Sequence, residues 1–450
     1  MAKVKDMTVG SPTKNILKFC LPLMLGNLFQ QFYNMADTII VGRFLGASAL
    51  AAVGATSTVS FLMLGFAMGL ATGFSVLTSQ QFGAGDEDGV KVSVANGILL
   101  ALLFSALLTA AGLKAVPVLL SLMHTPPDIA ADATAYMLVI CAGLTASMFY
   151  NLFSSFLRSV GNSRAPFFFL AFSSCLNIVL DIWFIVYIGA GVRGAACATV
   201  VSQVVSVLLC ALYILLRVRV LIPSARHWGL NRAATAHQLR MGIPMALQFA
   251  VTAAGTIVMQ TAINMFGSVA VAAFTAAWRI QNVLTQGMVA MGQTMAAFCG
   301  QNFGSKNIER VRQGVRTAVR IEIIYSAAAG IAAVVLLPWF LRLFFSGSAG
   351  IGDLMPWAMI YTVESALFFI PLSLIFIFRN AMQGCSYSFL PLMGGVVEMA
   401  ARTLCALAGI RLHSYLLSAG CDAAAWITAG TFLLLSYRYM LMKLTAKDAS

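Results

Sequence analysis

The sequence predicts an all-α integral membrane protein with twelve transmembrane helices, arranged in two six-helix lobes related by internal pseudo-symmetry. Its 450 residues are 60% hydrophobic and only 10% charged, which leaves too little polar surface to cover a soluble globule of this size. Residues 80–83 read Gln-Gln-Phe-Gly and residues 301–304 read Gln-Asn-Phe-Gly, 221 positions later. The composition therefore places the chain in lipid, and the repeat divides it into two related halves.

The repeat extends beyond one shared tetrapeptide. The same offset aligns residues 45–46 with 266–267 and residues 90–91 with 311–312. Duplicated halves in a membrane chain are typical of transporters. Because each half contains an even number of helices, the repeats are expected to be parallel, related by an axis along the membrane normal.

Each half contains six apolar stretches long enough to cross the hydrocarbon, which takes roughly 20 helical residues for about 30 Å. In the first half we expect helices near 16–40, 50–78, 92–120, 132–157, 166–188 and 194–216. In the second half we expect them near 241–265, 271–299, 315–345, 355–380, 390–410 and 416–441. These spans give an N-terminal lobe (1–216), a cytoplasmic linker (217–240) and a C-terminal lobe (241–450).

Short polar loops separate the helices. Residues 86–88 close the loop between the second and third helices, and residues 307–309 are their counterpart in the second half. Residues 158–166 and 379–391 close the two loops between the fourth and fifth helices. The longest polar stretch, 217–240, contains proline, glycine and five arginines, so it is the expected linker between the lobes.

The net charge of +13 is a topology signal rather than a nucleic-acid footprint. The basic residues alternate by loop, with 21 Lys and Arg on the side of the N-terminus and five on the opposite side. The positive-inside rule then predicts a multi-pass protein of the cytoplasmic membrane with both termini in the cytoplasm. We expect no nucleic-acid partner; membrane lipid is the expected surrounding, with a minor attraction to anionic lipid.

Few ionisable side chains fall within the predicted spans. A charged group at the bilayer centre costs about 2.5–3.5 kcal/mol or more, so each such residue is a functional candidate. They are Asp37, Asp181, Glu364, Glu398, Arg279 and Arg402. Glu322 is expected nearer the cytoplasmic end of its helix, beside Arg320.

The first helix carries a polar stripe. Gly26, Gln30, Tyr33 and Asp37 follow one another at spacings of four, three and four, which puts them on one helix face. Pro22 precedes the stripe and removes a backbone donor, so a membrane helix can bend there. The alternative for Asp37 is a local role, as a cap or hydrogen-bonding group near a helix end.

Other helices of the first half add oxygen atoms. Asn177 and Asp181 share a face of the fifth helix, Asn151 lies on the fourth, and Thr199 on the sixth. Carboxylate, carboxamide and hydroxyl oxygens in a closed cavity suit either a proton or Na⁺. Two neighbouring carboxylates cannot both stay charged unless a cation joins them.

The second half breaks the symmetry. An offset of 222 aligns Pro22 with Pro244 and puts Met259 where Asp37 stands, so the seventh helix carries no acid. Glu398 and Arg402, four apart on one helix, can neutralise each other and are interpreted as structural.

Glu364 has no obvious partner and is a candidate second ion or substrate site. Arg279 either neutralises it or lines the central cavity. On the second helix, Gly65, Gly69 and Gly73 follow a small-xxx-small spacing, which predicts close packing against another helix.

Two of these segments carry a family resemblance. Residues 37–46 read Asp-Thr-Ile-Ile-Val-Gly-Arg-Phe-Leu-Gly, and residues 177–181 read Asn-Ile-Val-Leu-Asp. Together with two six-helix halves, they make the chain similar to the MATE (multidrug and toxic compound extrusion) family of efflux transporters, in particular its DinF-like bacterial and archaeal type. The resemblance covers essentially the whole chain.

The resemblance implies a coupling-cation site in the N-terminal lobe. The residues that match its cation-site positions are Asp37, Asn177, Asp181 and Thr199. Tyr33 and Asn151 match neighbouring polar positions, and Pro22 matches the proline at which the first helix is proposed to bend. The candidate substrate and cavity residues are Tyr33, Gln30, Asn151, Glu364 and Arg279. NorM-type members use an acid on the seventh helix, which this chain lacks, although its tenth helix carries Glu364.

The implied activity is antiport by alternating access, in which H⁺ or Na⁺ enters while amphipathic, often cationic, drugs or toxic organic compounds leave. We expect no cofactor, no enzymatic activity and a monomer. The nearest alternative is a lipid-linked oligosaccharide flippase or other lipid flippase of related fold, which commonly needs more cationic residues for pyrophosphate. A membrane transferase is disfavoured because the loops contain no DDxxD, HxxxxD or metal-ligand cluster, and a channel is disfavoured by the duplicated halves.

Overall fold

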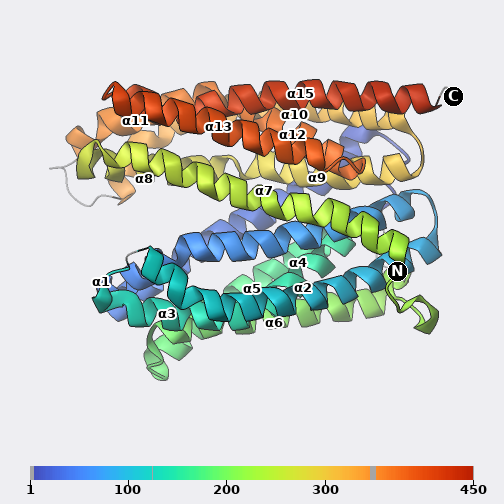
Figure 1. Cartoon of the computed structure of the whole chain (residues 1–450), viewed down its shortest axis with the longest axis horizontal. Coiled ribbons are helices and arrows are strands. Elements are labelled where there is room, and N and C mark those ends of the chain that lie inside the picture. Colours follow the sequence, from blue (N-terminus) through green and yellow to red (C-terminus); the bar gives the residue numbers. More distant parts are fainter. Residues whose placement is uncertain (1–4, 124, 345–350, 449–450) are drawn as a thin grey trace. The chain divides into compact units, whose positions relative to one another are not determined.

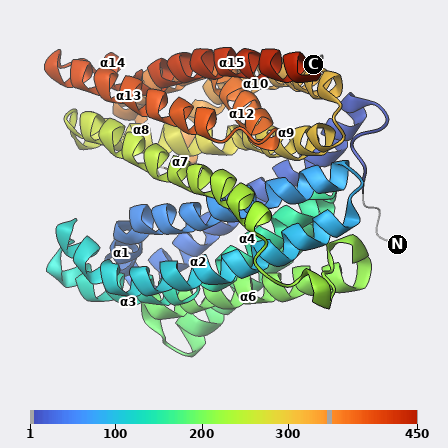
Figure 2. The ribbon, with the colours of Figure 1, turned by 45° about the vertical axis from the view of Figure 1, so that its right-hand side comes forward.

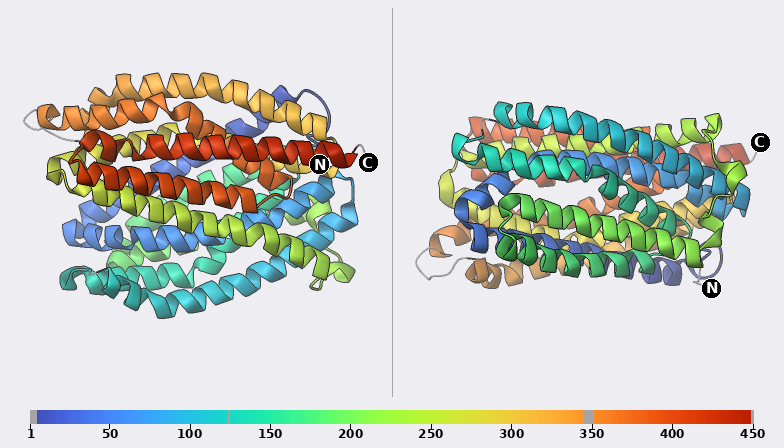
Figure 3. Two further views of the ribbon diagram at one scale, coloured as in Figure 1. Left: turned by 45° about the horizontal axis from the view of Figure 1, so that its top comes forward. Right: turned by 90° about the horizontal axis from the view of Figure 1, so that it is seen from below.

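The computed structural model describes residues 5–123, 125–344 and 351–448, and its regular elements are all helical. Contacts divide the chain into two compact units. Unit 1 comprises Met1–Met7 and Leu21–Ala250, and unit 2 comprises Thr8–Cys20 and Val251–Ser450. Within each unit the helices run side by side (Figure 3). The expected lobe bounds of 1–216 and 241–450 stay a prediction.

Unit 1 contains the first six predicted spans. Its helices are α1 (Pro12–Gly83) from residue 21 onward, α2 (Glu87–Leu122), α3 (Pro127–Ala142), α4 (Leu144–Ser159), α5 (Arg164–Ile182) and α6 (Gly191–Arg217). A π-helical turn, η1 (Trp183–Tyr187), follows α5, and two 3-10 turns, η2 (Arg219–Leu221) and η3 (Ala225–His227), lead to α7 (Arg232–Asn264). Unit 1 also includes α7 up to Ala250.

Unit 2 contains the remaining spans. Its helices are the rest of α7, α8 (Gly267–Leu284), α9 (Gln286–Gly304), α10 (Ile308–Phe344), α11 (Ile351–Leu367), α12 (Phe369–Gly384), α13 (Phe389–Arg411), α14 (Tyr415–Ala419) and α15 (Cys421–Asp448). The last helix, α15, packs along α13 and α12 (Figures 1 and 2).

The twelve predicted spans are confirmed, and each falls within one helix or one pair of adjoining helices. By length and composition, seven described helices can each cross a membrane, and two further spans are bent pairs: α3 with α4 at 46° and α11 with α12 at 49°. Helix α1 holds two spans, since its 72 residues would extend about 108 Å as one straight rod. Gly46 separates them with φ +87° and ψ −179°, a conformation open essentially to glycine alone.

The bend between α11 and α12 has a local cause. Pro371 lies in the first turn of α12, where its ring conflicts with the carbonyl group four residues earlier, on Leu367. The α-helix therefore stops at Leu367 and restarts at Phe369. At the other bend, a Cβ atom on Gly143 would lie 2.3 Å from Cγ2 of Val200, so glycine allows α6 to approach there.

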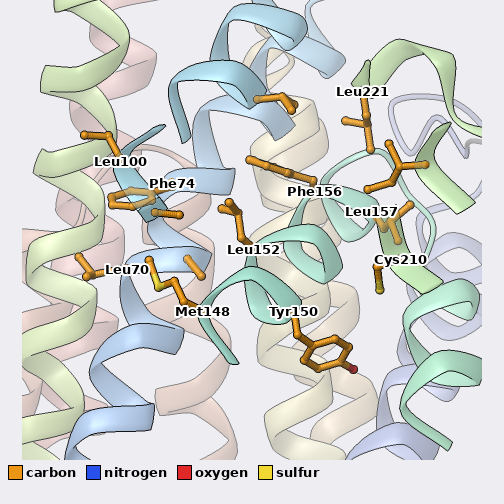
Figure 4. Close-up of a cluster of buried hydrophobic side chains, with 14 of the residues drawn as sticks. Leu70, Phe74, Leu100, Met148, Tyr150, Leu152, Phe156, Leu157, Cys210 and Leu221 are labelled. Carbon is orange, nitrogen blue, oxygen red and sulfur yellow. The ribbon is translucent and has the colours of Figure 1, made fainter. Parts of the chain in front are cut away.

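The core of unit 1 is aliphatic and aromatic. Leu70 and Phe74 from α1, Leu100 from α2, and Leu152 and Phe156 from α4 are almost completely buried and pack in one cluster (Figure 4). Against lipid this cluster gains little from the hydrophobic effect, so close van der Waals packing is its main stabilisation.

The predicted glycine stripe is confirmed as a helix contact. A Cβ atom on Gly69 would lie 2.5 Å from Cα of Ala246, and one on Gly73 would lie 2.4 Å from Cα of Gly242. The second span of α1 therefore touches the backbone of α7 along its first half. Beside this contact, the Gln238 carboxamide donates to the Phe74 and Ser93 carbonyl groups at 3.0 and 2.8 Å.

Helix α7 begins at Arg232 rather than at residue 241, so the connection after α6 is shorter than expected. Asp88 at the start of α2 holds this connection through its carboxylate. Arg226 Nη2 donates to Asp88 Oδ1 at 2.7 Å, and His227 Nε2 lies 3.1 Å from the same oxygen. The Ser224 backbone N–H donates to His227 Nδ1, which leaves Nε2 as the donor to Asp88.

Candidate functional site

Helices α1 and α5 bring two acids together inside unit 1. Asp181, near the end of α5, is 0% exposed, and Asn177, one turn earlier, is 1% exposed. The carboxyl groups of Asp37 and Asp181 lie within hydrogen-bonding reach of each other. Two carboxyl groups can share a hydrogen bond only when one of them carries a proton, since a carboxylate is solely an acceptor. A shared hydrogen bond between them therefore requires one proton on the pair.

Hydroxyl groups surround the acid pair. The Tyr33 hydroxyl, one turn before Asp37, lies within hydrogen-bonding reach of Thr199 on α6. Thr199 Oγ1 also donates to the Ala195 carbonyl at 3.2 Å. Tyr136 on α3 is 9% exposed and close enough to interact electrostatically with Asp37, Asp181 and Tyr33. Sequence reasoning missed Tyr136, because a tyrosine in an apolar helix reads as a core residue.

A change of helix type follows the site. Immediately after Asp181, the regular helix gives way to the π-helical turn Trp183–Tyr187, where the Ile188 N–H donates to the Trp183 carbonyl at 3.1 Å. Such turns are rare and appear often at functional sites, because they shift the helix face by one residue.

The other predicted site residues are more dispersed. Asn151 is half-buried, and its Nδ2 donates to the Ser147 carbonyl of its own helix at 2.8 Å. Gln30 and Arg279 are exposed, and Pro22 is half-buried. No acid in the described ranges forms an ion pair with Arg279, so the first of its two alternatives, neutralisation of Glu364, is not found.

Glu364 lies on α11 in unit 2 and is half-buried. Within the part of the chain that the structure describes, its Oε2 has no hydrogen-bond partner. Its carboxylate borders the break between α14 and α15, since a Cβ atom on Gly420 would lie 3.5 Å from Glu364 Oε1. Glu322 on α10 is only 2% exposed and about four turns into its helix, deeper than its sequence position suggested.

The predicted pair of Glu398 and Arg402 is confirmed, and the structure adds two members to it. Arg402 Nη2 donates to Glu398 Oε1 at 3.1 Å and to Asp422 Oδ1 at 2.8 Å. The Tyr361 hydroxyl donates to Asp422 Oδ2 at 3.0 Å. These four side chains form the buried polar hub of unit 2. Sequence reasoning missed Asp422, because it falls at the start of the last helix, where an acid usually meets water.

The donor set of the acid pair suits a proton or a monovalent cation. Among the described residues, no group of three or more His, Cys, Asp or Glu side chains could hold a metal ion. Two carboxyl groups, a carboxamide and hydroxyls supply only oxygen atoms, which are hard ligands. The arrangement fits H⁺ or Na⁺ better than a transition metal.

Comparison with known proteins identifies the family of the chain. A family model described as MatE matches residues 22–183 and 244–404, one match in each half. The probable multidrug resistance protein YpnP of Bacillus subtilis (strain 168) is 32% identical over 311 residues, which is 69% of each chain. An FAD transporter of Shewanella oneidensis is 24% identical over 405 residues, covering 89% of this chain and 88% of its own.

A solved structure extends the likeness over the whole chain. The crystal structure of MATE in the bent conformation has a TM-score of 0.91, with 25% identity and all of both chains covered. The resemblance read from the sequence is thus confirmed. The chain belongs to the MatE family, whose members are membrane transporters of multidrug efflux and not enzymes.

Proposed function

We propose that this chain exports amphipathic, often cationic, compounds across the cytoplasmic membrane in exchange for H⁺ or Na⁺. The observation that carries the proposal is the contact between the half-buried Asp37 on α1 and the buried Asp181 on α5. Asn177, Tyr33 and Thr199 complete a cation site made only of oxygen donors. Related proteins named for multidrug resistance support the substrate class.

The acid pair gives a physical basis for coupling. Without a cation, the buried carboxylate of Asp181 and the half-buried carboxylate of Asp37 would both be charged and would repel each other across α1 and α5. A proton or Na⁺ removes that repulsion and draws the two helices together. Since α1 contains Pro22, which donates no hydrogen bond to the Lys18 carbonyl, its first span can change its bend when the pair is neutralised.

Transport then follows by alternating access. Cation and substrate favour different conformations, and that difference in affinity is the coupling free energy. Uptake of the cation from outside stabilises the state that releases substrate outward. Return to the inward state requires loss of the cation to the cytoplasm and binding of new substrate.

We further propose a monomer with both termini in the cytoplasm. The surplus of basic residues on the loops of one side supports this orientation. The two ends themselves, residues 1–4 and 449–450, lie outside the described residues. Lipid surrounds the apolar faces, where many leucine, phenylalanine and isoleucine side chains are exposed.

The first test is efflux of a fluorescent lipophilic cation from cells that express wild type, Asp37→Asn or Asp181→Asn. Proton and sodium gradients are imposed in turn. We expect both variants to lose gradient-driven efflux by at least tenfold, because a carboxamide takes up no proton at this pH and carries no negative charge to attract Na⁺. Asp128→Asn is the matched control, since Asp128 is an exposed acid at the start of α3.

Each outcome has a clear meaning. Dependence on one gradient alone identifies the coupling ion. Full activity in both variants would exclude the Asp37 and Asp181 site and direct attention to Glu364. If wild type exports no lipophilic cation, the next substrates to test are flavin adenine dinucleotide, because one relative carries the name FAD transporter, and a lipid-linked oligosaccharide.

A further inference from the structure

The buried polar hub of unit 2 contains its own cation. Arg402 donates three hydrogen bonds to two carboxylates: Nη2 to Asp422 at 2.8 Å, Nε to the same oxygen at 3.2 Å, and Nη2 to Glu398 at 3.1 Å. The exposed fractions of the Arg402, Glu398 and Asp422 side chains are 6%, 11% and 6%. Two carboxylates this close and this buried would otherwise need a mobile cation between them.

The charges of the hub are balanced by the protein itself. Glu398 and Asp422 contribute two negative charges, and Arg402 contributes one positive charge. Arg379, on α12, also acts on Glu398 electrostatically and adds a second positive charge nearby. The Tyr361 hydroxyl satisfies the second oxygen of Asp422. The hub therefore has no charge deficit that a free cation would fill.

The residues of the hub lie on helices of unit 2 that the repeat relates to the helices around the acid pair in unit 1. The repeat relates the first, fifth and sixth spans to the seventh, eleventh and twelfth, which are α7, α13 and α15. Glu398 and Arg402 lie on α13, and Asp422 lies on α15. In unit 1, the acid pair and its hydroxyl partner lie on α1, α5 and α6. Each half thus places a cluster of two acids within the same set of three equivalent helices, although the acids come from the first and fifth spans in unit 1 and from the eleventh and twelfth in unit 2.

Helix α7 is shaped to admit the guanidinium. The offset of 222 that aligns Pro22 with Pro244 also puts Gly255 at the place of Tyr33. A Cβ atom on Gly255 would lie 2.7 Å from Arg402 Nη1, so a larger side chain would displace the arginine. With Met259 in place of Asp37, α7 brings no acid and leaves the space that Arg402 occupies.

We infer that Arg402 is a tethered cation, occupying in unit 2 the kind of two-carboxylate site that takes a free coupling cation in unit 1. Unit 2 then remains permanently neutralised through the transport cycle, and the coupling cation binds only in unit 1. Removal of the guanidinium should expose a latent site for H⁺ or Na⁺ between Glu398 and Asp422. The location of the coupling cation rests on the proposed function, whereas the latent site does not.

The test uses Arg402→Met in an Asp181→Asn background, so that the unit 1 site cannot contribute. The purified protein is heated in detergent at increasing NaCl, with choline chloride at equal ionic strength, and at several pH values. We expect the unfolding midpoint of Arg402→Met to rise by several degrees with Na⁺ or with falling pH, because either cation neutralises the exposed carboxylates. The Asp181→Asn parent should show no such response.

Two controls separate cation binding from general destabilisation. Arg402→Lys keeps a tethered charge and should stay insensitive to free cation, although its midpoint falls because an ammonium cannot reproduce the planar fork of hydrogen bonds. The triple variant Glu398→Gln, Arg402→Met, Asp422→Asn carries no hub charge and should also be insensitive. A response confined to Arg402→Met supports the tethered cation.

Other results overturn the proposal. One is a cation response in the Asp181→Asn parent that Glu398→Gln abolishes, because unit 2 would then already bind a free cation. Another is an unfolding midpoint of Arg402→Met that changes with neither the Na⁺ concentration nor the pH. If Arg402→Met cannot be recovered folded at any NaCl concentration or pH while the triple variant folds, the site does not accept a free cation. Failure of the Asp37 and Asp181 efflux test would leave these outcomes unchanged.

Discussion

Glu364 is half-buried and, among the described residues, no cation pairs with it and its Oε2 accepts no hydrogen bond. We propose that Glu364 attracts cationic substrates, because its carboxylate has no cationic partner to neutralise it. We expect Glu364→Gln to raise the KM for a lipophilic cation by about tenfold or less, equivalent to roughly 1.4 kcal/mol of lost attraction. Transport assays in vesicles with cationic and neutral amphipathic substrates would measure this effect.

The neutral substrate is the internal control for Glu364→Gln, since its KM should not change. The choice of coupling ion should also stay as in wild type, because Glu364 lies in unit 2 and the acid pair in unit 1. Loss of all gradient dependence in Glu364→Gln would instead make Glu364 a coupling residue.

At the residue level, the sequence was most informative where a side chain conflicts with its surroundings. Asp181 lies between apolar neighbours in the sequence, so a buried carboxyl group there needs a polar partner. The structure supplies that partner in Asp37. Tyr136 and Tyr361 carried no such signal, because aromatic side chains belong in apolar helices. Asp422 was overlooked for the opposite reason: helix starts favour acids, so its position looked ordinary. Only packing reveals that Arg402 reaches it.

Among the helices, the contact between α1 and α7 in unit 1 depends on glycine. A Cβ atom on Gly73 would lie 2.4 Å from Cα of Gly242, a distance that only backbone movement can relieve. We expect Gly73→Ala to destabilise the protein by about 1–3 kcal/mol and to lower its unfolding midpoint. Thermal unfolding in detergent would measure the change.

Gly54, in the same helix α1, provides the control. A Cβ atom added at that position would have no other atom within 4 Å, so Gly54→Ala meets open space. Alanine favours the helix by up to about 1 kcal/mol, and the midpoint of Gly54→Ala should stay level or rise. Equal destabilisation by the two substitutions would show that helix packing at Gly73 is not the cause.

The sequence predicted all twelve spans but not where they break. Apolar length is a strong signal, since each span needs about 20 residues regardless of its neighbours. The position of a break within a span depends on single residues and on tertiary contacts. Pro371 could have marked the bend at Phe368, whereas the break between α8 and α9 at Thr285 has no proline or glycine at that position. The approach of Val200 to Gly143 is a tertiary contact that no local pattern contains.

Over the whole molecule, two helices contribute to both units. Residues 12–20 of α1 pack with unit 2, and the helix joins unit 1 from Leu21, directly before Pro22. Helix α7 does the reverse, since it belongs to unit 1 up to Ala250 and to unit 2 from Val251, shortly after Pro244. Any movement of one unit against the other must therefore bend α1 and α7 or pull part of each from its contacts.

Pro22 is where such a bend in α1 needs least energy. Alanine would restore the hydrogen bond to the Lys18 carbonyl and stiffen the helix, which an internal proline weakens by about 3 kcal/mol. We expect Pro22→Ala to keep or raise the unfolding midpoint while the maximal rate of gradient-driven efflux falls severalfold. Pro117→Ala is the matched control, because Pro117 lies inside α2, which belongs to unit 1 alone. Loss of rate in Pro22→Ala but not in Pro117→Ala would tie transport to bending of the helix shared by both units. Undiminished efflux in Pro22→Ala, at a folded fraction equal to wild type, would mean that α1 moves without bending at this residue.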